Sequence, residues 1–317
     1  MMNVRIQDLT PVAGVTVANP FTHFCRRGRA NRANERGREL DRQGRTTEAL
    51  AEYERACRLD PEWSVPFYNI GLVHKYAGRW ELSLQHNQRA VERDASDTDA
   101  CWNLGIAATA LGRWDVARRA WRAAGIAVPD GTGPIDFPCG RTPVRLNPAT
   151  DGEVVWCDRL DPVRAAIRNI PLPESGFRFR DIVLHDGAAN GYRKLGDQER
   201  PVFDCLLLLE RSAFSTYVAQ IQPGDQSSWD AVMNRLADDA LDREMAAEDW
   251  TSSVAFICEA CSTGRPHEQH HHERIVHEGP HRVAIAAPAE PDARALIAAW
   301  LPHSTGARLL QFDVFTR

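Results

Sequence analysis

Small residues recur every 34 positions between residues 30 and 130 of this 317-residue chain. Gly37, Gly71 and Gly105 are one period apart, and a second glycine follows each of them seven residues later. Three further positions keep the same step, and they hold Ala49, Ser83 and Ala117, then Tyr53, Asn87 and Trp121, then Ala56, Ala90 and Ala124. A fixed period of this length predicts stacked supersecondary units, because one such unit cannot bury its apolar face alone.

Each copy of the period predicts two helices that fold back on each other. In the second copy the first helix is expected over residues 64–77, the turn at Gly78 and the second helix over residues 80–93. Glycine inside a helix costs about 1 kcal/mol relative to alanine. A glycine kept at that place in three copies therefore predicts that the two helices approach too closely there for a side chain.

The repeats resemble the tetratricopeptide repeat (TPR) family. The resemblance rests on Asn-Ile-Gly at residues 69–71, Asn-Leu-Gly at 103–105, Ala-Gly-Arg-Trp at 77–80, Leu-Gly-Arg-Trp at 111–114 and Leu-Asp-Pro at 59–61. It implies helical hairpins stacked into a right-handed superhelix, with a concave groove that binds a peptide or protein partner. The first copy departs from the pattern, since Arg36 replaces the usual apolar residue before the glycine. We interpret that copy as the polar terminal cap that a solenoid needs.

The resemblance also implies which residues line the groove. The first helix of each hairpin would form the inner surface, and residues three or four apart share a helix face. The residues expected there are Asn34, Arg38, Tyr68, Asn69, Leu72, Lys75, Trp102, Asn103 and Ile106. Tyr68 and Trp102 are the expected hydrophobic anchors.

Two asparagines in this set carry the sharpest expectation. The amides of Asn69 and Asn103 can each pair with both groups of an extended peptide backbone. The alternative is that they are the common residue at that position and bind no ligand. Asp99 stands where relatives that clamp C-terminal carboxylates carry a lysine, so we do not expect that mode of binding.

Eight arginines gather between residues 26 and 45, at positions 26, 27, 29, 32, 36, 38, 42 and 45. Clustered arginine can supply salt-dependent phosphate contacts to an acidic partner such as RNA. However, Glu35, Glu39 and Asp41 are interleaved with these arginines, and blocks of charge are usually solvated faces. We therefore favour a solvent-exposed capping helix and expect no nucleic-acid partner, and the net charge of -5 gives no argument for one.

The composition, with 43% hydrophobic and 26% charged residues, is that of an ordinary globular protein. No apolar run approaches the roughly 20 residues that span a bilayer, and residues 1–20 lack the features of a secretory signal. The eight cysteines are irregularly spaced and do not suggest a disulfide framework. We therefore expect a cytoplasmic protein without a membrane partner.

The sequence predicts an α+β multidomain protein. Residues 1–29 are interpreted as a lead-in segment and residues 30–130 as the TPR domain. Residues 131–149 are rich in glycine and proline and are expected to be a linker. Short apolar runs separated by turns then predict a β-rich subdomain over residues 150–213.

Residues 214–317 follow the order strand, helix, strand, strand, helix, strand. This order predicts a ferredoxin-like sandwich. One additional helix is expected to be inserted over residues 249–261, with the second strand over residues 272–278. Such folds host many functions, so the prediction names none.

A Cys-x-x-Cys pair in the same region is followed by several histidines. Thiolate and imidazole are the ligands that zinc prefers, and Cys258, Cys261, His267 and His270 could close a tetrahedral site. Glu268 or Glu273 could then act as a base if one metal position stayed open to water. The alternative is that both cysteines belong to the apolar face of a helix and are core residues.

Two functions follow from these patterns. The first is a protein-interaction adaptor that binds a peptide or protein in the groove of its TPR array, with a C-terminal module of regulatory or binding role. The second is a zinc-containing enzyme whose C-terminal domain is catalytic and whose repeats recruit substrate or mediate oligomerisation. The repeats favour the first, because no phosphate-binding glycine loop and no arrangement of catalytic residues stands out. Zinc is the single cofactor that the sequence suggests.

Overall fold

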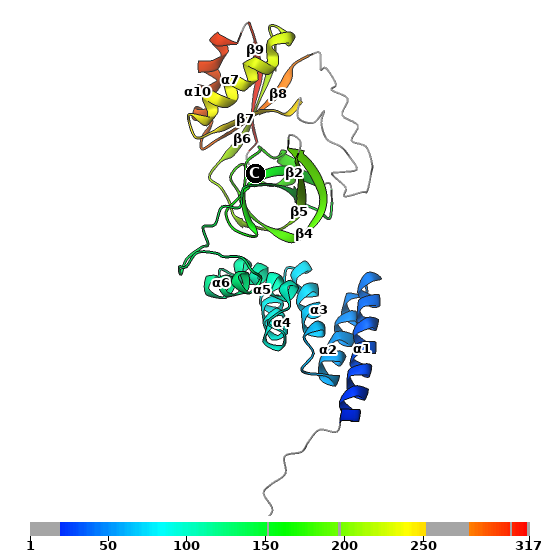
Figure 1. The fold of residues 1–317 in the computed structure, drawn as a ribbon. Coiled ribbons are helices and arrows are strands. Elements are labelled where there is room, and N and C mark those ends of the chain that lie inside the picture. Colours follow the sequence, from blue (N-terminus) through cyan, green and yellow to red (C-terminus); the bar gives the residue numbers. More distant parts are fainter. Residues whose placement is uncertain (1–19, 151, 196–197, 252–278, 305, 316–317) are drawn as a thin grey trace, which may run out of the picture.

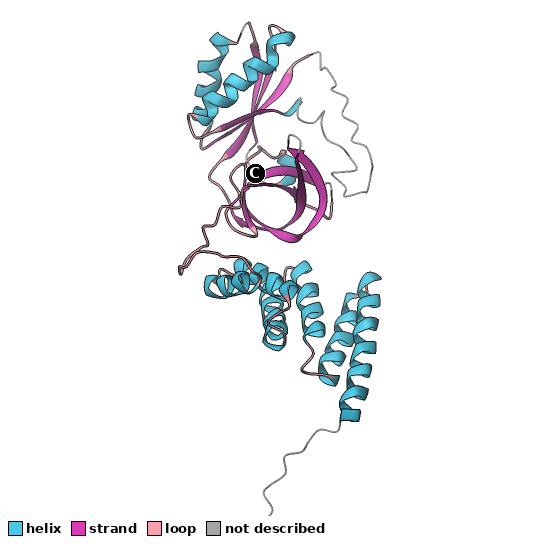
Figure 2. Cartoon of the chain, viewed as in Figure 1, coloured by secondary structure: helices cyan, strands magenta, loops and turns pink. Residues whose placement is uncertain are grey.

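The computed structural model describes residues 20–150, 152–195, 198–251, 279–304 and 306–315. Along the chain it consists of six helices, a closed β-barrel and a four-stranded sheet with two helices. The barrel lies between the repeat helices and the sheet (Figure 1). Figure 2 shows that helices make up the first part and that strands dominate the second. Within these described ranges no helix combines the length and apolar character needed to cross a membrane.

The three predicted helical hairpins are confirmed. Their helices are α1 (Pro20–Arg42), α2 (Thr46–Leu59), α3 (Ser64–Tyr76), α4 (Trp80–Arg93), α5 (Thr98–Ala110) and α6 (Trp114–Ala123). Helix α1 begins at Pro20, so residues 20–29, expected as lead-in, extend the first helix. The turn glycines at residues 44, 78 and 112 have φ angles of 73°, 66° and 64°, a left-handed conformation that glycine adopts with little penalty.

The mid-helix glycines mark close contacts inside each hairpin. A Cβ atom on Gly105 would lie 2.6 Å from the Trp121 ring, and one on Gly71 would lie 2.5 Å from the Asn87 amide. Trp121 is fully buried. The sequence expectation that these glycines make room for the facing helix is therefore confirmed.

The second part is a five-stranded barrel. Its strands are β1 (Arg141–Leu146), β2 (Glu153–Arg159), β3 (Arg164–Ile167), β4 (Ile182–Leu195) and β5 (Gln198–Glu210). Consecutive strands pair antiparallel, and β1 closes the barrel by pairing parallel with β5, with Val144 beside Phe203. The closure is parallel because the first and last of five alternating strands run in the same direction.

Strand β1 lies inside the segment that we expected to be a linker, so the barrel begins before residue 150. Gly140, Pro143 and Pro148 give this segment the composition of a loop. Nevertheless, Pro143 sits in the ladder opposite Trp156 of β2. Composition reports local preference, whereas the pairing with a distant strand decides the conformation here.

The third part is an antiparallel sheet with strand order β7-β8-β6-β9. Its elements are β6 (Ser215–Gln222), α7 (Trp229–Leu241), β7 (Ala246–Asp249), β8 (His281–Ala287), α10 (Glu290–Trp300) and β9 (Arg308–Phe315). Helices α7 and α10 cover one face, where Leu236 and Trp300 pack with Tyr217 and Ile285. Strand β7, which we did not predict, pairs with β8 on the side away from β6. Residues 272–278, where we placed the second strand, and 252–261, most of the inserted helix, lie outside the described residues.

An apolar cluster joins the repeats to the barrel. It contains Ile106 and Trp121 from the repeats, Ile135 from the connecting segment, and Val163 and Leu184 from the barrel region. All five side chains are at most 1% exposed. The repeats and the barrel therefore share a core, and the burial of this apolar surface favours one fixed arrangement.

Two buried carboxyl groups lie at the junction between the barrel and the sheet. Glu153 accepts a hydrogen bond from the Leu172 N–H (3.1 Å), and Glu248 accepts one from Asn169 Nδ2 (2.9 Å). Burial raises the pKa of Glu153 to about 7, with a smaller contribution from the charge of Glu248. Burial also raises the pKa of Glu248 to about 6. Burial at this junction therefore makes both carboxyl groups weaker acids than ordinary glutamates.

Replacing Gly105 with alanine should destabilise the repeats, because the new Cβ would overlap the Trp121 ring. Overpacking of this kind costs about 1–3 kcal/mol. The matched control is Gly28→Ala in α1, where a Cβ meets nothing within 4 Å. This control should instead raise stability by up to about 1 kcal/mol, the gain in helix propensity. Urea unfolding followed by circular dichroism measures both, and a Gly105→Ala variant as stable as the parent would contradict the packing account.

Replacing Glu153 with glutamine should change how stability depends on pH. A carboxyl group whose pKa in the folded protein lies above its ordinary value of 4.5 contributes fully to stability below about pH 4.5. This contribution to stability is lost as the pH rises to about 7. The variant should therefore be more stable than the parent at pH 8, by on the order of 1–3 kcal/mol. Unfolding curves between pH 4.5 and 8 test this, with the exposed Glu210→Gln as control. A parent and variant with parallel pH profiles would exclude the effect.

Candidate functional site

The structure divides the nine predicted groove residues into two groups. Lys75, Trp102 and Ile106 lie where helices α3 and α5 meet the barrel. Asn34, Arg38, Tyr68, Asn69 and Leu72 lie on α1 and α3. Of these, Asn34 is buried, Tyr68, Asn69 and Leu72 are half-buried, and Arg38 is exposed. Asn103, on α5, is buried between the two groups.

A buried ion pair joins the repeats to the barrel. Lys75 Nζ lies 2.9 Å from Asp186 Oδ1, and the two side chains are only 3% and 6% exposed. The Asp186 carboxylate also accepts the Gly187 N–H at 2.7 Å. Burial by itself raises the pKa of Asp186, but the charge of Lys75 and the hydrogen bonds it receives outweigh burial and lower that pKa. Asp186 is therefore an ionised carboxylate held by the inner helix of the second hairpin.

The irregular stretch of β4 after Asp186 lies on Trp102. A Cβ atom on Gly187 would be 3.0 Å from the Trp102 indole, so a side chain there would require the indole to shift by a few tenths of an ångström. Trp102 in turn contacts Trp121 edge-on, with ring centroids 5.0 Å apart. Ile106 belongs to the apolar cluster that continues into Leu184 of β4. We expected Lys75, Trp102 and Ile106 to line an open groove. They contact the barrel of the same chain instead, because the barrel covers this end of the concave surface.

The asparagines are already partly engaged within the repeats. Asn103 Nδ2 donates to the Asp99 carbonyl one turn earlier (3.1 Å), and its side chain is buried. Asn69 Nδ2 donates to Asn34 Oδ1 (2.8 Å). Asn69 is half-buried and keeps its Oδ1 as an acceptor, so of the two it is the one placed to pair with a partner's backbone N–H.

The open part of the concave surface therefore combines four kinds of group. Arg38 is exposed and makes an ion pair with Glu35 (3.2 Å). Tyr68 and Leu72 are half-buried and offer an aromatic and an aliphatic surface, and Asn69 offers an amide oxygen. A guanidinium, an amide and two apolar surfaces can bind a polypeptide segment. Among these four described side chains, none is a nucleophile paired with a base.

The predicted zinc ligands lie outside the described residues. Cys258, Cys261, His267 and His270 all fall within residues 252–278, as do Glu268 and Glu273. In the part of the chain that the structure describes, no three His, Cys, Asp or Glu side chains gather as a metal site. His281, which the sequence groups with this cluster, is buried, and its Nδ1 lies 2.7 Å from Asp249 Oδ2 inside the sheet module.

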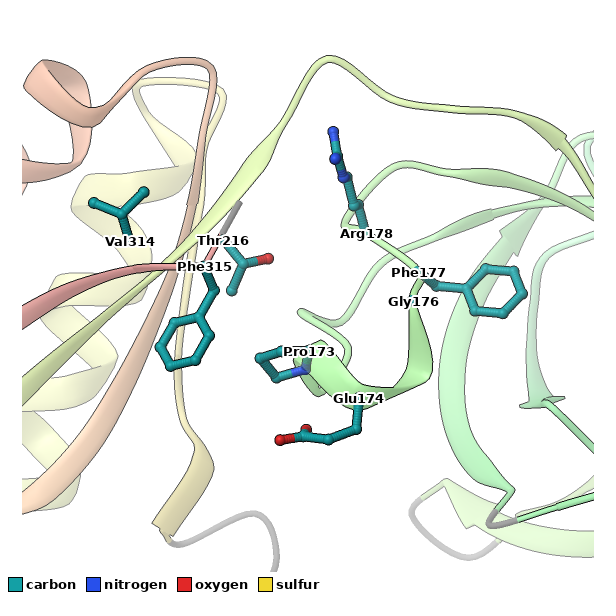
Figure 3. Close-up of a pocket in the computed structure, with 8 residues that line it drawn as sticks. All are labelled: Pro173, Glu174, Gly176, Phe177, Arg178, Thr216, Val314 and Phe315. Carbon is teal, nitrogen blue, oxygen red and sulfur yellow. The ribbon is translucent and has the colours of Figure 1, made fainter. Parts of the chain in front are cut away.

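A small recess lies between the barrel and the sheet (Figure 3). It has a volume of about 280 Å³ and is lined by Pro173, Glu174, Gly176, Phe177, Arg178, Thr216, Val314 and Phe315. The Thr216 and Phe315 side chains lie on the side of Pro173 and Glu174, whereas Phe177 points away toward the barrel. Its titratable residues are Glu174 and Arg178, which do not form a catalytic pair with a nucleophile.

Two features of this structure are not predicted by the sequence. The sequence predicts a turn at Asp186-Gly187, but both residues lie within strand β4, at an irregularity in its pairing with β5. Nothing local signals that Asp186 pairs with Lys75. Glu153 and Glu248 were also missed, because a lone glutamate in a strand is usually exposed. Both features depend on which distant surfaces meet.

The chain was compared with known families, curated proteins and solved structures. No protein-family model matches the chain, and no curated protein matches it. Among solved structures, the second TPR domain of Spaghetti (RPAP3) bound to the HSP90 peptide SRMEEVD is 19% identical. The match covers 33% of this chain and 95% of that one, with a TM-score of 0.31. The TPR domain of Arabidopsis OM64 is 18% identical, covering 31% and 82% of the two chains with a TM-score of 0.30. Each of these two matches covers about a third of this chain.

Replacing Lys75 with methionine should destabilise the protein by about 3–5 kcal/mol, because it leaves Asp186 as an unpaired buried charge. Replacing both partners, as in Lys75→Met/Asp186→Leu, should recover much of this loss, since an apolar pair is often as stable as a buried ion pair. Denaturant unfolding of the single and double variants measures the coupling. Arg119→Met, which breaks an ion pair that is 70% exposed on both sides, is the control and should change little. Additive losses in the double variant would show that the two residues are not coupled.

Proposed function

We propose that this protein is a protein-interaction adaptor whose partner is a peptide or a protein segment bound on the concave surface of the first two repeats. The observation that carries the proposal is the division of that surface. The barrel covers the end at Lys75 and Trp102, while Tyr68, Asn69 and Leu72 remain accessible. The binding surface is therefore shorter than the three-repeat groove that the sequence predicts.

The side chains on the open surface suit an extended polypeptide. Tyr68 and Leu72 are the apolar anchors, since aromatic and well-packed apolar residues dominate interface energies. The Asn69 amide oxygen accepts a backbone N–H of the partner. Arg38 lies at the rim, where a charge contributes more to the association rate than to affinity.

The C-terminal module completes the proposed adaptor. We propose that residues 214–317 form a ferredoxin-like sandwich with a regulatory or binding role. The strand order β7-β8-β6-β9, antiparallel throughout, and the packing of α7 and α10 on one face support this fold. The barrel separates this module from the repeats (Figure 1). This arrangement suits an adaptor that connects two partners.

The experiment compares affinity capture by the intact chain and by a Tyr68→Ala/Asn69→Ala variant. A partner held in the open groove should be lost from the variant or bind at least about tenfold more weakly, because anchor residues contribute about 2 kcal/mol or more. The matched control is Arg119→Ala on α6, an exposed residue away from the groove. Equal helical circular dichroism shows that each variant is folded. If the groove variant captures the same partner with the same affinity, the concave surface is not the binding site.

A further inference from the structure

A second, larger cleft separates the barrel from the sheet module and is independent of the repeats. Its volume is about 590 Å³, within the range of roughly 300–1,000 Å³ that small-molecule sites occupy. Its polar lining consists of Arg141, Asp158, Arg168, Asn169 and Arg180 from the barrel side, and Asp238 and Glu248 from the sheet module. Clefts between two modules are a preferred place for ligands.

The two walls carry opposite charge. On the barrel side Arg141 and Arg168 share one carboxylate, Asp158, at 3.3 and 3.0 Å. Arg180 adds a further cation, and it makes no salt bridge with another of the described residues. On the facing wall, Asp238 is exposed on α7, and the Glu248 carboxyl group accepts a hydrogen bond from Asn169. The cleft thus offers a cationic wall and an anionic wall to one occupant.

Arg180 is held in place before any ligand arrives. Its φ angle is 63°, which is unusual for a residue with a side chain. Its guanidinium carbon lies 5.4 Å from the Phe179 ring centroid and 5.2 Å from that of Phe214, a cation–π arrangement. Strained backbone that presents a fixed charge is typical of ligand-binding sites.

Apolar side chains line the space between the charged walls. Trp156, Ile167 and Ile182 contribute from the barrel, and Met245 and Leu241 from the sheet module. Leu241 is 60% exposed and gives the cleft lining an accessible aliphatic surface. At the floor, Glu248 is hydrogen-bonded to Asn169, and its burial raises its pKa to about 6. A buried carboxyl with a shifted pKa in a cleft is a recognised sign of a functional site.

We propose that this cleft binds a small zwitterion with an apolar body, namely a free apolar amino acid or a short apolar peptide. Arg180 takes the carboxylate, Glu248 and Asp238 take the ammonium group, and Trp156 and Leu241 cover the apolar part. Neither wall alone would prefer this class of ligand, since a simple anion would face Asp238 and Glu248 and a simple cation would face three arginines. The proposal does not rest on the groove, because none of these residues contacts the repeats' open surface.

Calorimetric titration of the full chain tests the proposal with four probes. L-Phenylalanine and the dipeptide leucyl-phenylalanine carry both charges, and the one that binds more tightly distinguishes an amino acid from a peptide. N-acetyl-L-phenylalanine lacks the ammonium group, and L-phenylalaninamide lacks the carboxylate. We expect a zwitterionic probe to bind with a Kd of about 1 mM or lower and both single-charge probes to bind at least about tenfold more weakly.

Two variants assign the charges to the walls. Arg180→Gln should weaken binding of the zwitterion but leave L-phenylalaninamide unaffected, since that probe has no carboxylate. Glu248→Gln should weaken the zwitterion but leave N-acetyl-L-phenylalanine unaffected. Arg243→Gln, exposed and outside the cleft lining, is the control. Thermal unfolding shows that each variant is folded. If no zwitterionic probe binds, or if binding is the same in Arg180→Gln and in the parent, the cleft is an ordinary crevice between modules and the proposal is wrong.

Discussion

The ion pair between Lys75 and Asp186 joins residues 111 positions apart and is buried on both sides. A buried charge without a partner is strongly destabilising, so each of these residues requires the other to remain where it is. Trp102 and Gly187 lie in close contact beside the pair, and an apolar cluster extends it. Together these contacts fix the barrel on the repeats and decide how much of the concave surface stays open.

This arrangement changes how the repeats can work. A free array of three hairpins would offer its whole inner surface to a partner, whereas here the last hairpin packs against the barrel of the same chain. The surface that remains runs over α1 and α3 and combines a half-buried tyrosine, leucine and asparagine with an exposed arginine. The barrel is therefore a structural joint, because it contacts the repeats on one side and the sheet module on the other.

The two junctions of the barrel differ in chemistry. The junction with the repeats is largely apolar and contains the buried Lys75–Asp186 ion pair. The junction with the sheet packs Ile170 and Phe179 against Val218 and Ala284, yet it also encloses the carboxyl groups of Glu153 and Glu248 and borders an open cleft. Buried titratable groups next to accessible space are typical of sites that respond to ligands or pH.

The sequence by itself determined the repeats, because the 34-residue period, the turn glycines at positive φ and the close approach at Gly71 and Gly105 are encoded within each copy. Strand β9 and helix α10 were also predictable from local patterns. Only the tertiary structure decided that β1 belongs to the barrel, since its proline-rich segment becomes a strand through pairing with β2 and β5. It also decided which groove residues are open, since Leu72 and Lys75 share a helix face and Lys75 is buried because Asp186 of the distant strand β4 pairs with it.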